Sequence, residues 1–154
     1  MTVRVQTDDF DIGAEIQTLI AGRTDLGAVV SFTGIVRDGG GGEGKVVAMT
    51  LEHYPGMTEA ELERIEAEAR DRWPLSASLI VHRYGRLEPG DNIVLVITAS
   101  THRQAAFEAA SFLMDYLKTS APFWKKEERA AGDSGWVDEK TSDEAAIRRW
   151  RTGS

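Results

Sequence analysis

The feature that most constrains the fold of this chain is an unbroken apolar run from Ile93 to Ile97. A strand with one face in solvent alternates apolar and polar residues, so a continuous run predicts a strand buried on both faces. A helix is expected directly afterwards, because Thr101 and Gln104 have capping-box spacing and the helical pattern continues to about Lys118. Pro122 cannot continue that helix. The sequence therefore predicts a buried strand that runs straight into a helix.

The rest of the chain mixes strands and helices without regular alternation. Alternating or β-branched segments predict strands, and apolar residues three or four positions apart predict helices. Strands are expected at residues 2–7, 27–37, 47–51, 76–84, 92–100 and 136–137, and helices at 11–21, 58–73, 101–118 and 142–150. Because the order is not a repeated strand–helix–strand unit, an α+β fold is favoured over a doubly wound α/β fold.

A glycine-rich segment, residues 38–44, separates the second and third of these strands. Glycine-rich turns commonly join antiparallel neighbours, so the two strands are expected to form a hairpin with this segment as its tip. Gly39 to Lys45 also has the spacing of a phosphate-binding loop. However, Val46 stands where that loop has Ser or Thr, and a strand follows instead of a helix. No nucleotide site is predicted.

Composition limits the classes of function. With 154 residues the chain has the size of one domain, and its net charge of -7 argues against a general nucleic-acid binder. It has no cysteine, which excludes a thiolate nucleophile, a zinc–thiolate site and a protein-bound persulfide. Any sulfur chemistry must therefore import its sulfur. Neither a secretory signal nor an apolar run of membrane-spanning length is present, so we expect a cytoplasmic protein without membrane contact.

The three histidines do not form a metal-binding pattern. His53, His82 and His102 are scattered, and no metal site is predicted. His53 and His82 fall on expected strands, where a structural role is favoured. His102 precedes Arg103 at a helix N-terminus, where free N–H groups and the helix dipole favour an anion. Residues alone leave two alternatives for that pair, a phosphate ligand or a solvated first turn.

Two lysines flank the segment TSAPFW. Lys118 precedes it and Lys125 follows it, and its Pro122, Phe123 and Trp124 can form a rigid apolar wall. A lysine held against such a wall loses its proton more readily, and the neutral amine can act as a base or a nucleophile. The alternative is that lysine is simply common at helix C-termini.

Four motifs resemble those of one known family. FTGIVRD at 32–38, LEHYPGM at 51–57, VHRYGRLEPGD at 81–91 and the combination THR…LKT.APFWKKE at 101–127 occur in order over nearly the whole chain. Together they resemble the large, catalytic subunit of molybdopterin synthase.

The resemblance implies a fold, a reaction and partners. The expected fold is α+β, with a hammerhead-like α/β portion and additional antiparallel strands, in a single domain over residues 1–154 that ends in a tail at 142–154. The expected reaction is sulfur transfer to cyclic pyranopterin monophosphate, which forms the dithiolene of molybdopterin. The sulfur donor is the C-terminal glycine thiocarboxylate of a small ubiquitin-like subunit. The expected assembly is a heterotetramer with a homodimer of large subunits at its centre, without a cofactor.

The resemblance also assigns site residues by motif. Lys118 and Lys125 are the implied catalytic pair. Lys126 stands where relatives also have arginine, which keeps the charge but not bidentate geometry. The implied substrate-contacting residues are Ile35, Val36, Arg37, His102, Arg103, Lys118, Lys125, Lys126 and Glu127.

The spacing of these residues suggests a shared site. If residues 101–118 form one helix, His102 and Lys118 are 16 positions apart, or about 24 Å along its axis. One small substrate cannot readily touch both within one chain, so we hypothesise that each pocket straddles the two-fold axis of a homodimer. Two other functions stay open from the residues alone, a binding module that presents a phosphorylated pterin and a lysine-based Schiff-base enzyme.

Overall fold

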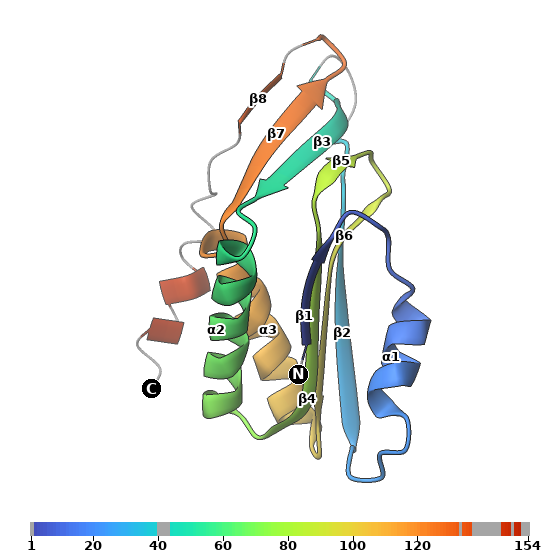
Figure 1. Ribbon diagram of the computed structural model, residues 1–154, viewed down its shortest axis with the longest axis vertical. Coiled ribbons are helices and arrows are strands. Elements are labelled where there is room, and N and C mark those ends of the chain that lie inside the picture. The colour runs from blue at the N-terminus through green and yellow to red at the C-terminus, as the bar shows by residue number, and fades with distance from the viewer. Residues whose placement is uncertain (1, 40–43, 133, 137–145, 149, 152–154) are drawn as a thin grey trace.

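The computed structural model describes residues 2–39, 44–132, 134–136, 146–148 and 150–151. The described chain forms two four-stranded sheets and three principal helices (Figure 1). One sheet has the strand order β1-β4-β6-β2, and the other has the order β5-β3-β7-β8. The elements are β1 (Thr2–Gln6), α1 (Ile12–Ile20), β2 (Ala28–Ile35), β3 (Val46–His53), α2 (Met57–Arg72), β4 (Leu75–Arg83), β5 (Gly85–Leu87), β6 (Asn92–Ser100), α3 (Arg103–Thr119), β7 (Phe123–Arg129) and β8 (Ser134–Trp136).

The first sheet is mixed and is covered on both faces. β1 is parallel to β4, whereas β4 with β6 and β6 with β2 are antiparallel. In β6, Val94 and Val96 pack with α2 and α3, while Leu95 and Ile97 pack with α1 on the opposite face. The prediction of a strand buried on both faces is therefore confirmed. So is the α+β fold, because the second sheet adds antiparallel strands to this helix-covered one.

The predicted hairpin between residues 27–37 and the strand that follows is wrong. β2 pairs with β6 in the first sheet, whereas β3 pairs with β5 and β7 in the second. The chain leaves the first sheet after Val36, whose main chain still bonds to Gly90 and Asp91 beside β2. The buried Val36 side chain packs in a cluster with Met49 and Leu51 of β3. Residues 40–43 of the expected hairpin tip lie outside the described residues.

Two helices begin at other residues than their expected capping boxes. α2 starts at Met57, and Glu59 accepts a hydrogen bond from the N–H of Gly56, so the box lies two positions earlier than predicted. The residue before α3 is His102, whose side chain makes no capping hydrogen bond. Thr101 instead donates its hydroxyl hydrogen to the carbonyl of Asp25. Neither shift moves the apolar face of its helix.

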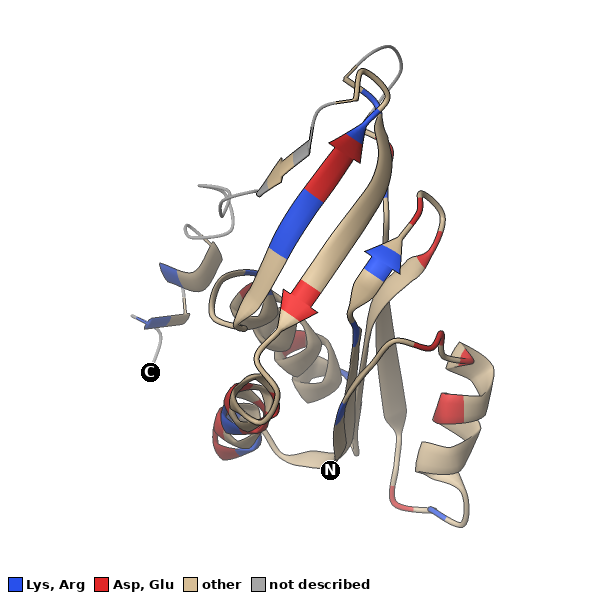
Figure 2. Cartoon of the chain, turned by 45° about the horizontal axis from the view of Figure 1, so that its top comes forward, with Lys and Arg blue, Asp and Glu red and all other residues tan. Residues whose placement is uncertain are grey.

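The outer surface of α2 carries many charges of both signs (Figure 2). The described residues of the C-terminal segment pack beside this helix, where Ile147 is buried and the Trp150 ring contacts the rings of Trp73 and Phe112. Val137 of the last expected strand and residues 142–145 of the expected terminal helix lie outside the described residues. No helix in the described part of the chain is long and apolar enough to cross a membrane.

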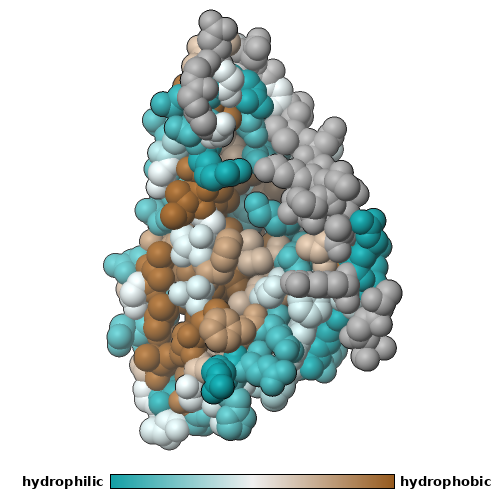
Figure 3. All heavy atoms as spheres, turned by 180° about the vertical axis from the view of Figure 1, so that it is seen from behind, coloured by the Kyte–Doolittle hydropathy of each residue, from teal (hydrophilic) through white to brown (hydrophobic). Residues whose placement is uncertain are grey.

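Strand β2 forms one edge of the first sheet and exposes apolar side chains. Val29, Phe32 and Ile35 are all exposed, and Phe32 has 41% of its surface in solvent. Figure 3 shows a band of apolar side chains on the face of the molecule seen from behind. An edge strand with unpaired main-chain groups and apolar side chains is a ready surface for another chain.

A buried carboxyl on α2 makes stability depend on pH. Glu66 is 3% exposed and accepts a hydrogen bond of 2.7 Å from Ser78 Oγ, and burial raises its pKa. Ionised Glu66 therefore lowers stability above its folded pKa, and this cost disappears as the pH falls below its unfolded pKa. We expect Glu66→Gln to raise the Tm by about 2 °C at pH 7.5 and to give no gain near pH 4.

The matched control for that prediction is Glu63→Gln, which removes the same charge from an exposed position of the same helix. Thermal unfolding of both variants at the two pH values measures the difference. An equal gain from both variants would show that net charge, and not burial of Glu66, sets the effect.

Candidate active site

Helix α3 carries cationic or titratable residues at both of its ends. His102 immediately precedes the helix, Arg103 is its first residue, and both are exposed. Lys118 lies in its last turn and is also exposed. Since α3 is continuous, His102 and Lys118 are separated by about 24 Å along its axis. The structure therefore keeps these two predicted parts of the site at opposite ends of one helix (Figure 1).

Strand β7 holds three further predicted site residues. Successive side chains of a strand point to opposite faces, so Lys125, Glu127 and Arg129 share one face and Lys126 lies on the other. The lysines and glutamates form adjacent blue and red bands along the strand (Figure 2). Lys125 Nζ lies 3.6 Å from Glu127 Oε1, and Arg129 Nη2 lies 2.9 Å from Glu127 Oε2. The Glu127 carboxylate therefore joins two cations and restrains Lys125.

One short turn separates α3 from β7, so Lys118 and Lys125 lie on either side of it. Thr58 Oγ1 donates a hydrogen bond of 3.0 Å to the carbonyl of Pro122 and accepts one of 3.0 Å from the N–H of Tyr54. Because Thr58 is fully buried, these bonds are shielded from water and tie the turn to the start of α2. The two lysines thus flank a turn that the rest of the fold holds in place.

A buried histidine packs against this turn. His82, near the end of β4, stacks on Phe123 with ring centroids 3.8 Å apart. Its pKa is lowered to about 4, mainly by burial and further by its electrostatic interactions with Lys118 and His53. His82 is therefore neutral at pH 7.

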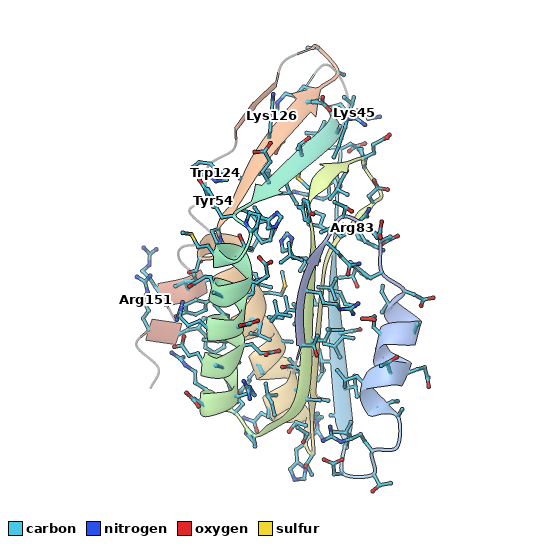
Figure 4. All side chains as sticks on the ribbon, viewed as in Figure 1. Lys45, Tyr54, Arg83, Trp124, Lys126 and Arg151 are labelled. Carbon is cyan, nitrogen blue, oxygen red and sulfur yellow. The ribbon has the colours of Figure 1, made fainter. Side chains whose placement is uncertain are left out.

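The sequence predicted structural roles for His82 and His53, and it did not reveal that His82 lies close to Lys118. Both histidines fall within motifs that carry the family resemblance, which was the only signal that pointed to them. The predicted apolar wall also differs in detail. Phe123 faces His82, whereas Trp124 is exposed beside Tyr54, with ring centroids 6.1 Å apart (Figure 4).

The predicted site residues at the end of β2 and directly after it differ in how far their side chains are exposed. Ile35 and Arg37 are exposed, but Val36 is buried in a cluster with Leu51 and does not present its side chain to a ligand. Leu51 pairs with Lys125 across the β3–β7 ladder. Arg37 therefore lies toward the end of the molecule that holds Lys118 and Lys125, and His102 and Arg103 lie away from it.

The fold and the sequence of this chain match those of known proteins. Residues 5–120 match the family described as MoaE protein. The molybdopterin synthase catalytic subunit of Mesorhizobium japonicum is 58% identical over 154 residues, which covers 99% of this chain and 95% of the relative. The chain belongs to the MoaE family. Its relatives are catalytic subunits of molybdopterin synthase, which are enzymes of molybdenum cofactor biosynthesis. This assignment confirms the resemblance seen in the sequence.

Solved structures agree with this assignment. The molybdopterin biosynthesis MoaE protein from Burkholderia ambifaria MC40-6 has a TM-score of 0.83 and 53% identity, with 98% of each chain covered. A chain from the complex of subunits 1 and 2 of molybdopterin-converting factor from Helicobacter pylori 26695 has a TM-score of 0.72 and 19% identity, with 90% of this chain and 91% of that chain covered. At that identity the second likeness shows the fold alone.

Proposed function

We propose that this chain transfers sulfur, in the cytoplasm, from the C-terminal thiocarboxylate of a small ubiquitin-like subunit to cyclic pyranopterin monophosphate, forming the dithiolene of molybdopterin. The observation that carries the proposal is the turn between α3 and β7, which has Lys118 on one side and Lys125 on the other. The absence of cysteine agrees with a sulfur that arrives on another protein.

The two lysines suit an acyl transfer that needs no redox step. The thiocarboxylate sulfur bonds to a carbon of the substrate, an oxygen leaves that carbon with a proton, and a thioester joins the two molecules. Water then attacks the acyl carbon, the acyl C–S bond breaks, the carrier leaves as a carboxylate, and the sulfur stays on the substrate. Lys118 and Lys125 can stabilise the negative oxygen in each step or move the proton. Glu127 holds Lys125 in place for this role.

Cationic residues around the lysines fit a phosphorylated pterin. Arg37 and Lys126 come from the end of the molecule that holds the lysines, and His102 and Arg103 come from the free N-terminus of α3, where N–H groups favour a phosphate. Since the two groups are about 24 Å apart along α3, we assign His102 and Arg103 to the pocket of a second copy of the chain.

Two observations support this assembly. The exposed apolar side chains of edge strand β2 provide a surface for a homodimer. Relatives at 58% and 60% identity are named as the catalytic subunit of molybdopterin synthase, a name that supports a second kind of subunit bound to each large one. Together they favour a heterotetramer with two large subunits at its centre.

The test is reconstitution from purified components. The chain, the thiocarboxylated small subunit and cyclic pyranopterin monophosphate should together form the dithiolene product, and the small subunit with an ordinary carboxylate should give none. A folded chain that binds the pterin without forming product would be a binding module. A substrate adduct trapped by borohydride would instead indicate Schiff-base chemistry.

A further inference from the structure

A buried histidine packs against the start of β7, although it belongs to neither α3 nor β7, the two elements that carry the lysines. His82 comes from β4, which is otherwise a core strand, and its residue is 8% exposed. Its ring lies nearly parallel to that of Phe123, with an angle of 19° between the planes. Phe123 begins β7 and stands two residues before Lys125. The imidazole is thus held rigidly between the mixed sheet and the turn.

One hydrogen bond determines which ring nitrogen carries the proton. His82 Nδ1 lies 2.8 Å from the carbonyl oxygen of Arg83. A carbonyl can only accept, so Nδ1 donates, and the neutral ring has an unprotonated Nε2. The second nitrogen is then an acceptor fixed in direction by the first bond and by the stack on Phe123.

Only a cation or another donor complements such an acceptor. Lys118 lies in the last turn of α3, one short turn before the Phe123 ring on which His82 stacks. Lys118 and His53 both act electrostatically on His82. A second positive charge on His82 would repel that of Lys118, and burial disfavours it further. A neutral imidazole beside the lysine therefore suits the arrangement, because it can accept a hydrogen bond without adding charge.

We propose that His82 is a positioning residue, whose unprotonated Nε2 accepts a hydrogen bond from the Lys118 ammonium and holds this lysine toward the reacting atoms. The catalytic half of this inference rests on the proposed function, but the contact itself does not. The alternative is that His82 serves only the packing of the turn, through its stack on Phe123 and its bond to Arg83.

Two substitutions distinguish the positioning role from the packing role, because the glutamine and asparagine amides can each mimic a different ring nitrogen of histidine. His82→Gln can keep an acceptor near the position of Nε2, whereas His82→Asn can keep the donor to the Arg83 carbonyl and removes the acceptor. We expect His82→Asn to lower kcat for dithiolene formation about tenfold or more, with KM within about twofold, and His82→Gln to retain most of the activity. A packing role predicts the reverse order of the two variants.

A second measurement needs no substrate. The rate at which acetic anhydride modifies Lys118 at pH 8, followed by mass spectrometry, should rise about threefold in His82→Asn and stay near the wild-type rate in His82→Gln, because losing the acceptor favours the neutral amine. Lys126, on the opposite face of β7, is the internal reference. Thermal unfolding confirms that each variant is folded. If His82→Asn is not, His82→Phe keeps the stack, removes both nitrogens and should show the same rise.

The outcomes distinguish this inference from the proposed function. Equal modification of Lys118 in wild type and a folded His82→Asn or His82→Phe variant would overturn the contact. If the wild-type chain forms no dithiolene but the modification rates separate the variants as expected, the contact stands and the proposed reaction falls. If the rates separate and kcat does not, His82 contacts Lys118 without positioning it for catalysis.

Discussion

Replacing Lys118 by alanine should reduce the rate of dithiolene formation by about 10²- to 10⁴-fold, the range associated with losing a general acid or base or an oxyanion donor. Because Lys118 is exposed at the end of α3, its removal should leave the Tm within about 2 °C of wild type. Single-turnover assays with thiocarboxylated small subunit and cyclic pyranopterin monophosphate measure the rate, and pterin binding is measured separately.

Two control variants are needed to interpret the effect of Lys118→Ala. Lys45→Ala removes the same side chain from an exposed position that pairs with Asp38, and it should leave the rate within about twofold. Lys118→Arg keeps the charge but cannot give up its proton at neutral pH, so it distinguishes charge stabilisation from proton transfer. If Lys118→Ala weakens pterin binding but keeps more than a tenth of the single-turnover rate at saturation, Lys118 binds the substrate and is not catalytic.

Local patterns in the sequence predicted most of the elements. The apolar run in β6 and the helical spacing of Leu62, Ile65 and Ala69 in α2 each report burial directly, and these residues lie in the core. Such patterns reflect which side of an element faces the protein interior. They carry no information on which strand lies beside which, and this is why the hairpin between β2 and β3 was predicted wrongly.

Strand β7 was missed for a related reason. Its sequence FWKKEER is mostly charged and does not alternate between apolar and polar residues. Its strand form depends on main-chain pairing with β3 and β8, and on ion pairs such as Lys125 with Glu127 along one face. These partners are remote in sequence or visible only once the strand exists, so no local signal marks it.

The candidate site was likewise predicted only in part from local sequence patterns. Helix spacing alone separated His102 from Lys118, and the continuous α3 in the structure agrees. The roles of Lys118 and Lys125 came from family resemblance, because a lysine at a helix end has an ordinary explanation as well. The surroundings of His82 could not be predicted, since they combine residues from β4, α3 and β7 that meet only in the folded chain.

Mixing two inactive variants should restore activity if each pocket is shared between two chains. Lys118→Ala and His102→Ala each damage both pockets of their own homodimer. In a hybrid dimer one pocket carries both changes and the other carries neither. Random reassortment makes about half of the dimers hybrid, so the mixture should recover about a quarter of the wild-type activity. Differently tagged chains and native mass spectrometry verify that hybrids form.

A second mixture is the matched control for that recovery. Lys118 and Lys125 lie on either side of one turn of the same chain, so they should serve the same pocket. In a hybrid of Lys118→Ala with Lys125→Ala every pocket lacks one lysine, and the mixture should stay inactive. Recovery in the first mixture and not in the second therefore assigns His102 to the other chain. No recovery in verified hybrids of Lys118→Ala with His102→Ala would place His102 outside a shared pocket, since α3 keeps it too far from the lysines of its own chain.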